Sequence, residues 1–465
     1  MEYALDVTTL GLIFLILFGL TALKGRKSLL LGLATAIPFN SSSAFISGSV
    51  SISPFYLGLV LFIAWTVLER TANKETSLRR TPSKAVLIGF FVYVVSVTIF
   101  GPVLFRGIGV VASGIGMDEQ VRNLSALSPS SSNLAQVLYL ALCLAFIYVN
   151  ERDQIVGMRF LLVAFSVGTI VAILGLVCAR LGLTWPGELF DNSPRGFYST
   201  EMTRLRAQFA EPSQLGAFAL TATVFFTSMT FQSRNAFSFA FRLAFAAMAA
   251  ALVAASSSGS AVVGGLVAVA AFAILGVVRA TRPGALLAPS AVVASCAITI
   301  VMAYLLPKMA PFVTTIIADK QGGQSFTNRG LSNEIALDLF KQTFLIGVGL
   351  GSNRASSLLM MLLSTIGLVG TGLFLWIVAR SIANSIQIPA RLPAVLALIA
   401  LVATSFVSLA DFVSPLLWSL ICVCLAPGPT AVQNKIQDKR NQKRDSEPAG
   451  ALSASRGSDA GASPR

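Results

Sequence analysis

The stretch "SLLMMLLSTIGLVGTGLFLWIVA" (residues 357–379) runs without a single charged side chain. A helix of about 20 apolar residues spans the roughly 30 Å hydrocarbon core of a bilayer. Because lipid offers the backbone no hydrogen-bond partners, such a segment satisfies its own amides as a helix. The stretch therefore predicts a transmembrane helix.

This pattern recurs along the whole chain of 465 residues, of which 55% are hydrophobic and 12% are charged. Soluble domains carry roughly twice that charged fraction. The sequence predicts an all-α polytopic membrane protein with about 12–14 transmembrane helices and two large extracytoplasmic loops. Thirteen spans are expected, at residues 8–23, 28–46, 54–68, 85–105, 134–149, 160–183, 214–231, 237–255, 261–278, 285–306, 357–379, 392–409 and 415–426.

The basic residues set the expected orientation. They lie mainly in alternate short loops and in the C-terminal tail, as the positive-inside rule requires of cytoplasmic segments. The N-terminus then lies outside and the tail inside. The first apolar run lacks a small-residue cleavage site and is expected to be retained as a span. The net charge of +14 is thus assigned to orientation and not to nucleic-acid binding.

The spans and loops predict six regions. They are an N-terminal transmembrane bundle (1–183), an extracytoplasmic loop with an Arg/Glu motif (184–213), central transmembrane helices (214–307), a large extracytoplasmic loop (308–356), C-terminal transmembrane helices (357–426) and a disordered cytoplasmic tail (427–465). In the large loop, Leu331, Ile335 and Leu339 share one face of a predicted amphipathic helix, which is expected to lie in the membrane interface with that face down.

The composition excludes several chemistries. The chain has no histidine, which removes histidine bases, Ser-His triads and most zinc sites. The five cysteines fall in or at the ends of apolar runs, in no metal-binding or disulfide pattern. No phosphate-binding glycine motif follows a strand. We therefore expect neither a metal nor a cofactor.

The stretch "RLRAQFAEPSQLGAFAL" (residues 204–220) places charged residues directly before a predicted span. The guanidinium groups of Arg204 and Arg206 suit phosphate oxygens, and in an extended loop both could face the same side. The alternative is that they pair with Glu201 and Glu211, or contact lipid headgroups.

Glu211 is the candidate catalytic residue. Pro212 stiffens the entry to the span and Ser213 is the expected N-cap, which puts Glu211 beside the positive end of the helix. A sugar hydroxyl needs a base, and without histidine a carboxylate can serve. The alternative is that Glu211 only caps the helix and pairs with Arg206.

The segment "GVGLGSNR" (residues 347–354) is a candidate phosphate site. Alternating glycines can expose successive backbone N–H groups to an anion, which would involve Gly349 and Gly351, and Arg354 adds positive charge. Arg329, before the amphipathic helix, is a further candidate. Helix packing would explain the glycines equally well, and headgroup contact would explain the arginines. Asp411 is expected to be a solvated turn residue.

Both stretches resemble a known family. "GVGLGSNRASSLLMMLLSTIGLVGTGLFL" (347–375) and "RLRAQFAEPSQLGAFAL" look like signatures of the O-antigen ligase / polysaccharide polymerase superfamily. The resemblance implies a metal-independent inverting glycosyl transfer from an undecaprenyl-diphosphate-linked oligosaccharide, outside the bacterial inner membrane. It implies that Arg204, Arg206, Arg329, Arg354, Gly349 and Gly351 bind the diphosphate.

The resemblance favours a polymerase of exopolysaccharide or O-antigen repeat units. An O-antigen ligase is the first alternative, but ligase-type members carry a histidine in the long outer loop. Many members also carry an arginine where "SSSGSAVVGG" (256–265) has Gly259. A transporter or flippase of a lipid-linked saccharide would usually place charges at midspan, where this sequence has few. A non-catalytic scaffold stays open, as does a chain-length regulator as partner.

Overall fold

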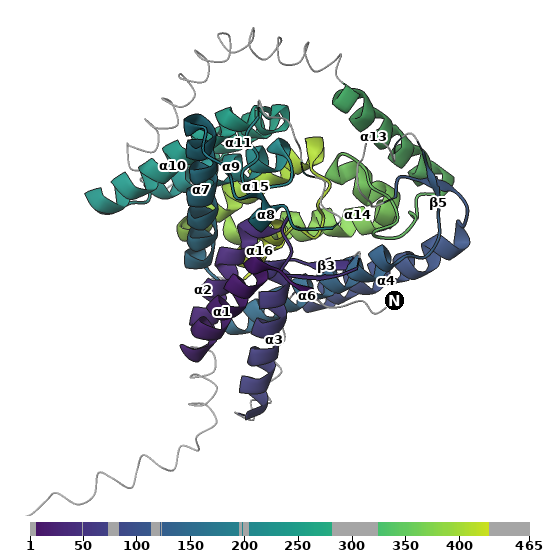
Figure 1. Ribbon diagram of the computed structural model, residues 1–465, viewed down its shortest axis with the longest axis horizontal. Helices are drawn as coiled ribbons and strands as arrows, with labels where there is room; N and C mark the ends of the chain where they lie inside the picture. The colour runs from purple at the N-terminus through teal and green to yellow at the C-terminus, as the bar shows by residue number, and fades with distance from the viewer. Residues whose placement is uncertain are drawn as a thin grey trace, which may run out of the picture. The chain divides into compact units, whose positions relative to one another are not determined.

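A computed structural model describes residues 6–48, 50–72, 83–112, 121, 123–194, 198, 204–280 and 324–426. The predicted span 285–306, residues 308–323 of the predicted large loop and the predicted tail 427–465 lie outside the described residues. The described chain is mostly helical, with two small antiparallel sheets (Figure 1). Its α-helices are α1 (Thr9–Leu23), α2 (Arg26–Ala36), α3 (Pro54–Ala72), α4 (Lys84–Leu104), α6 (Ser131–Asp153), α7 (Met158–Leu181), α8 (Gly187–Phe190), α9 (Pro212–Thr230), α10 (Ala236–Ser256), α11 (Gly259–Ala280), α13 (Gln324–Gln342), α14 (Leu358–Ser385), α15 (Leu392–Ser408) and α16 (Pro415–Leu425).

Within the described ranges, seven helices are long and apolar enough to cross a membrane. They are α3, α4, α6, α7, α10, α14 and the run Pro389–Ser408, which joins the short 3-10 helix η2 (Pro389–Arg391) to α15. Shorter apolar helices accompany them. The prediction of a helical membrane protein, with a lipid bilayer as its surroundings, is confirmed at this level.

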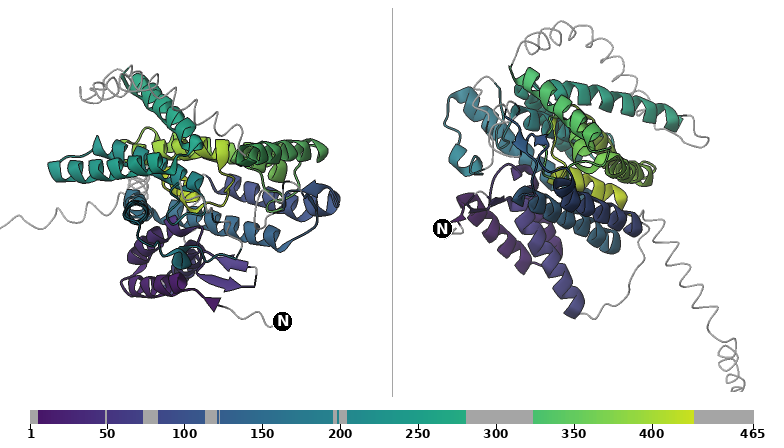
Figure 2. Two further views of the ribbon diagram at one scale, coloured as in Figure 1. Left: turned by 45° about the horizontal axis from the view of Figure 1, so that its top comes forward. Right: turned by 90° about the vertical axis from the view of Figure 1, so that its right-hand side faces the viewer.

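The predicted span 28–46 is wrong. Helix α2 ends at Ala36, and a 3-10 turn η1 (Ile37–Phe39) leads into strand β2 (Phe45–Ser47). Pro38 and the polar residues after it end the helix early, because proline cannot continue the helical hydrogen-bond ladder. Strand β2 pairs with β1 (Asp6–Val7) and with β3 (Val50–Ile52), as Figure 2 shows beside the first helices. A second sheet joins β4 (Gly109–Val110) to β5 (Ser125–Ala126).

An ionic network joins three helix ends. Arg26, at the start of α2, contacts Glu69 at 3.2 Å and Asp153 at 2.7 Å. Arg70, near the end of α3, contacts the same Asp153 at 2.9 Å. One shared carboxylate thus ties the start of α2 to the ends of α3 and α6. All of these residues flank the loops that the sequence predicts to be cytoplasmic.

Helix α14 is broken at Gly367. This residue has φ +66°, and a Cβ added there would lie 2.3 Å from the carbonyl oxygens of Leu345 and Ile346. The turn before the Gly-rich segment therefore packs directly on the helix, and the N–H of Leu368 donates to the Leu345 carbonyl at 2.9 Å. The predicted span 357–379 is thus two helical pieces, one on each side of Gly367.

The predicted amphipathic helix lies within α13, and part of its apolar face packs on protein. Leu339 is fully buried and forms a small core with Val110, Leu127 and Val348, against which Ile335 also packs. Strand β4, the residue after strand β5 and the Gly-rich loop therefore cover the Leu339 end of this face, while Leu331 is 39% exposed. The covered end packs on protein because these segments supply apolar side chains of their own.

Candidate functional site

The start of α9 differs from the prediction in one respect. The N-cap is Glu211, with φ −132° and ψ 150°, and Pro212 occupies the first helical turn. Proline favours this position because its missing N–H would have no helical partner there, which moves the cap from the predicted Ser213 to Glu211. The Glu211 side chain makes no capping hydrogen bond, while the hydroxyl of Ser213 donates to its Oε2 at 3.0 Å. The carboxylate thus caps no backbone N–H of α9 and contacts the Ser213 side chain instead.

Arg329 of α13 is the ionic partner of Glu211. Its Nη2 lies 3.5 Å from Glu211 Oε2, and its Nη1 donates to the hydroxyl of Ser408 at 2.7 Å. Three elements that are far apart in sequence, α9, α13 and α15, therefore meet at one point. The pairing of Glu211 with Arg206, which the sequence left open, does not occur.

Arg354 is brought to the same region by α13. Its backbone N–H donates to the carbonyl of Val111 at 2.9 Å, and its carbonyl accepts from the hydroxyl of Ser332 at 3.3 Å. Ser332 lies three residues after Arg329, and residues with this spacing share one face of a helix. One face of α13 therefore contacts Arg354 and carries Arg329.

Asp411 is not the solvated turn residue that the sequence predicts. It lies between α15 and α16, and its carboxylate accepts a hydrogen bond from Asn40 at 2.9 Å. Burial raises the pKa of the Asp411 carboxyl from 3.8 to about 6, while the charge of Arg354 and the hydrogen bond from Asn40 partly lower it. The site therefore contains a second carboxylate, with a pKa close to the neutral range.

The segment after α2 connects the two carboxylates. Asn40 contacts Asp411, and the neighbouring Ser41 donates to the Gln214 side chain at 2.9 Å and accepts from the Ala210 N–H at 3.3 Å. This chain of contacts runs from the Asp411 turn to the residues that flank Glu211. We call the connected set the carboxylate–arginine cluster: Asn40, Glu211, Arg329, Arg354 and Asp411.

The glycines of residues 347–351 serve packing. The N–H of Gly349 donates to the Thr365 carbonyl at 2.8 Å, so the predicted use of that N–H for an anion is wrong. Gly351 has φ +82°, and a Cβ there would lie 2.8 Å from the Ser132 carbonyl oxygen. Side chains are excluded because the loop passes directly against α4 and α6. These glycines contribute to the site by placing Arg354.

Two asparagines that carry no prediction from the sequence hold this loop. Asn133 donates to the carbonyl of Leu350 at 2.7 Å, and Asn333 accepts from the N–H of Ser356 at 3.1 Å. Each satisfies a backbone group that has no partner in regular secondary structure. Asn133 lies in the first turn of α6 and Asn333 in the middle of α13, and neither position carries a sequence signal for a contact with a distant loop.

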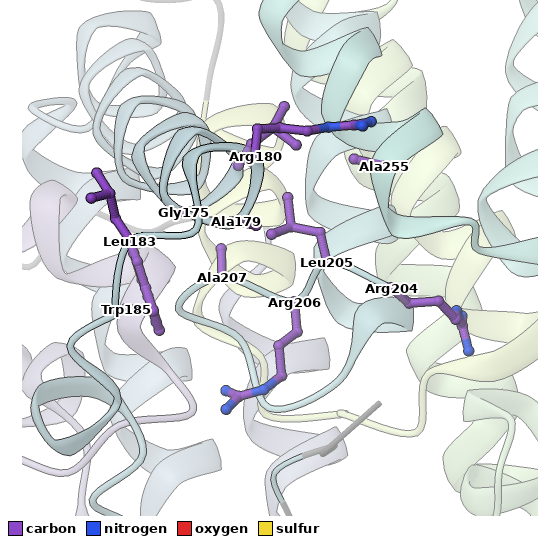
Figure 3. A pocket seen from close by; sticks show the side chains of 11 residues that line it. Gly175, Ala179, Arg180, Leu183, Trp185, Arg204, Leu205, Arg206, Ala207 and Ala255 are labelled. Atoms are coloured by element: carbon purple, nitrogen blue, oxygen red, sulfur yellow. The ribbon is translucent and has the colours of Figure 1, made fainter. Parts of the chain in front are cut away.

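The structure separates Arg204 and Arg206 from the cluster. Both Nη atoms of Arg206 contact the Asp191 carboxylate, with one distance of 2.7 Å, and its guanidinium lies 5.6 Å from the centre of the Tyr198 ring. Arg204 donates to the carbonyl of Ser256 at 3.3 Å. Figure 3 shows the side chains of Arg204 and Arg206 pointing to different sides, so the expected common orientation of the two arginines is not observed.

The raised pKa of Asp411 predicts how the stability of the protein depends on pH, whatever the function of the protein is. A pKa raised by folding means that the folded state holds its proton more tightly, so this residue lowers stability as pH rises from about 4 to 6. We expect Asp411→Asn to gain stability relative to wild type over that range, with no further gain above about pH 7. Thermal unfolding midpoints of both proteins, measured in one detergent across pH, test this. A difference that does not change with pH would contradict the assignment.

The helices and the cluster define a helical membrane protein with arginines and carboxylates gathered at helix ends. Within the described ranges, no group of three His, Cys, Asp or Glu residues could hold a metal ion. No protein-family model matches the sequence, and none of the curated proteins compared with it is a significant match.

Proposed function

We propose that the protein is a polymerase of lipid-linked polysaccharide repeat units and belongs to the O-antigen ligase / polysaccharide polymerase superfamily. It transfers glycan from undecaprenyl diphosphate on the outer face of the bacterial inner membrane. The chain crosses this membrane 12–14 times, and its C-terminal tail is cytoplasmic. One observation carries the proposal. Glu211, Arg329, Arg354 and Asp411 come from different elements and gather at one place.

The cluster fits the chemistry of an inverting transfer. The acceptor hydroxyl oxygen attacks the anomeric carbon, the bond from that carbon to the diphosphate oxygen breaks, and the diphosphate leaves with the electron pair. Arg329 and Arg354 stabilise the charge that develops on the leaving group. Glu211 takes the proton from the acceptor hydroxyl. The leaving diphosphate is thereby bound by the guanidinium groups of Arg329 and Arg354.

The loose contact between Arg329 and Glu211 suits this assignment. Their atoms are 3.5 Å apart, which is longer than the roughly 2.8 Å of a strong charge-assisted hydrogen bond. Both side chains keep partial access to solvent, at 36% for Arg329 and 23% for Glu211. An arriving phosphate can therefore replace Glu211 at Arg329 and leave the carboxylate free to accept a proton.

Two other functions fit less well. A ligase would use the same donor, but the chain lacks the histidine of ligase-type members. A transporter would place its charged residues at midspan. Glu211 instead stands at the N-cap position of a helix, and Asp411 lies in a turn between helices. Charges at helix ends favour group transfer at a surface over passage through the bundle.

The test compares surface and secreted polysaccharide in the host with and without the gene, restored by a plasmid copy. Loss of long polymer together with accumulation of single lipid-linked repeats is the expected result. Long polymer that persists on its carrier without reaching an acceptor would identify a ligase instead. Polysaccharide of unchanged amount, length and attachment would contradict both.

A further inference from the structure

The turn after α2 contacts the start of α9. Ser41 lies two residues beyond η1, and its hydroxyl donates to Gln214 Oε1 at 2.9 Å. The same hydroxyl oxygen accepts from the N–H of Ala210 at 3.3 Å. Ala210 directly precedes Glu211, and Gln214 follows Glu211 by three residues. One hydroxyl from a distant segment therefore binds the chain on both sides of the candidate base.

Gln214 adds a second bond to the same N–H. It occupies the third position of α9, and its Oε1 accepts from the Ala210 N–H at 3.2 Å. A glutamine at this position reaches back to the backbone at a helix start in the same way as in a capping box. The Ala210 N–H is thus shared between two side-chain oxygens, and the ring of Pro212 fixes φ directly after Glu211. These contacts fix the backbone that carries Glu211.

The turn that carries Ser41 is itself anchored. The Ser41 carbonyl accepts from the hydroxyl of Tyr198 at 2.7 Å. Two residues later, buried Ser43 exchanges two hydrogen bonds with the Asn192 side chain, at 2.7 Å through its N–H and at 3.0 Å through its carbonyl. Ser41 is therefore held in place independently of α9.

The Glu211 carboxylate depends on this backbone for its direction. Its contacts among the described residues are the hydroxyl of Ser213 at 3.0 Å and the guanidinium of Arg329 at 3.5 Å. Ser213 belongs to the same helix start, and the contact with Arg329 is the one that an arriving phosphate would replace. A general base must lie within hydrogen-bond reach of its proton, and a displacement of about 1 Å can lower a rate about 100-fold.

We propose that Ser41 is a positioning residue for Glu211. Through Gln214 and the Ala210 N–H, its hydroxyl holds the backbone in the position from which the Glu211 carboxylate reaches the acceptor hydroxyl. This role rests on the proposed function, since it requires Glu211 to act as the base.

Initial rates of the reconstituted protein at several donor concentrations test this role, with the lipid-linked repeat unit as donor. Ser41→Ala should lower kcat about tenfold, the upper effect of losing one hydrogen bond. The KM for the donor should stay as in wild type, because Arg329 and Arg354 bind the diphosphate from α13 and from the Gly-rich loop. Ser41→Thr keeps the hydroxyl and should retain most of the wild-type rate. Gln214→Ala breaks the same hydrogen bond from its other end and should lower kcat as Ser41→Ala does.

A double variant separates positioning from general damage. If Ser41 acts through the Glu211 carboxylate, Ser41→Ala should lower the residual rate of Glu211→Gln by less than about twofold, since the carboxylate is already absent. A residue that serves only folding would lower the rate by the same factor in both backgrounds. Ser96→Ala is the control, because the Ser96 hydroxyl donates to the Val92 carbonyl within α4 at 2.8 Å. It should match wild type.

Two outcomes would overturn the role of Ser41 alone. One is a wild-type kcat from folded Ser41→Ala or from folded Gln214→Ala. The other is an equal loss of rate on Ser41→Ala with and without the Glu211 carboxylate. In both cases wild type still forms polymer, so the proposed polymerase stands. Folded wild-type protein that forms no polymer would instead overturn the proposed polymerase, and the role of Ser41 with it.

Discussion

Glu211→Gln is expected to lower the rate of polymer formation by at least about 100-fold, the lower limit of what a general base contributes. Glutamine keeps the shape of the side chain and can still accept the hydrogen bond from Ser213. It cannot take a proton from an acceptor hydroxyl. The length distribution of polysaccharide in cells with equal membrane levels of each variant measures the effect.

Matched variants separate this effect from general damage. Glu188→Gln changes an exposed glutamate of the same predicted loop and should leave polymer length unchanged. Arg354→Ala should reduce polymer as Glu211→Gln does, whereas Lys341→Ala, at a lysine that is 65% exposed on α13, should not. Polymer of normal length from Glu211→Gln would show that Glu211 is not the general base.

Gly367→Ala is expected to prevent stable folding. The added Cβ would lie 2.3 Å from two carbonyl oxygens, at a residue whose φ of +66° already disfavours a side chain. We expect a loss of at least about 3 kcal/mol in the free energy of unfolding, because a backbone clash adds to conformational strain. The fraction of protein that elutes as a monodisperse species from mild detergent after heating measures this loss.

Gly372→Ala is the control for this change. It lies in the same helix, five residues further on, and a Cβ there meets no atom within 4 Å. This variant should elute like wild type, since alanine favours a helix more than glycine does. Equal elution of Gly367→Ala and Gly372→Ala would show that the break in α14 is not needed for folding.

Much of the helical architecture could be predicted from the sequence, because an apolar run long enough to span lipid has few alternatives to a helix. The break at Gly367 could not, since only the carbonyls of Leu345 and Ile346 explain it. The end of α2 was predicted too late, although Pro38 marked it. Composition therefore predicts that helices form. Contacts between distant segments decide where α14 breaks.

The site was partly predictable for a similar reason. Glu211, Arg329 and Arg354 were chosen for their chemistry beside helix starts and loops, and the structure brings them together. The sequence predicts only a solvated turn residue at Asp411, because its partner Asn40 lies 371 residues away in sequence. The expected common orientation of Arg204 and Arg206 is not observed, since Arg206 pairs with Asp191 and Arg204 donates to the Ser256 carbonyl.

Reconstitution tests the central claim most directly. Purified protein in liposomes receives its lipid-linked repeat unit together with a metal chelator, and the products are resolved by length. The proposal predicts that wild type forms a ladder of lipid-linked oligomers and releases undecaprenyl diphosphate, while Glu211→Gln retains the donor without converting it. Absence of any ladder from folded wild-type protein, or an equal ladder from Glu211→Gln, would contradict it.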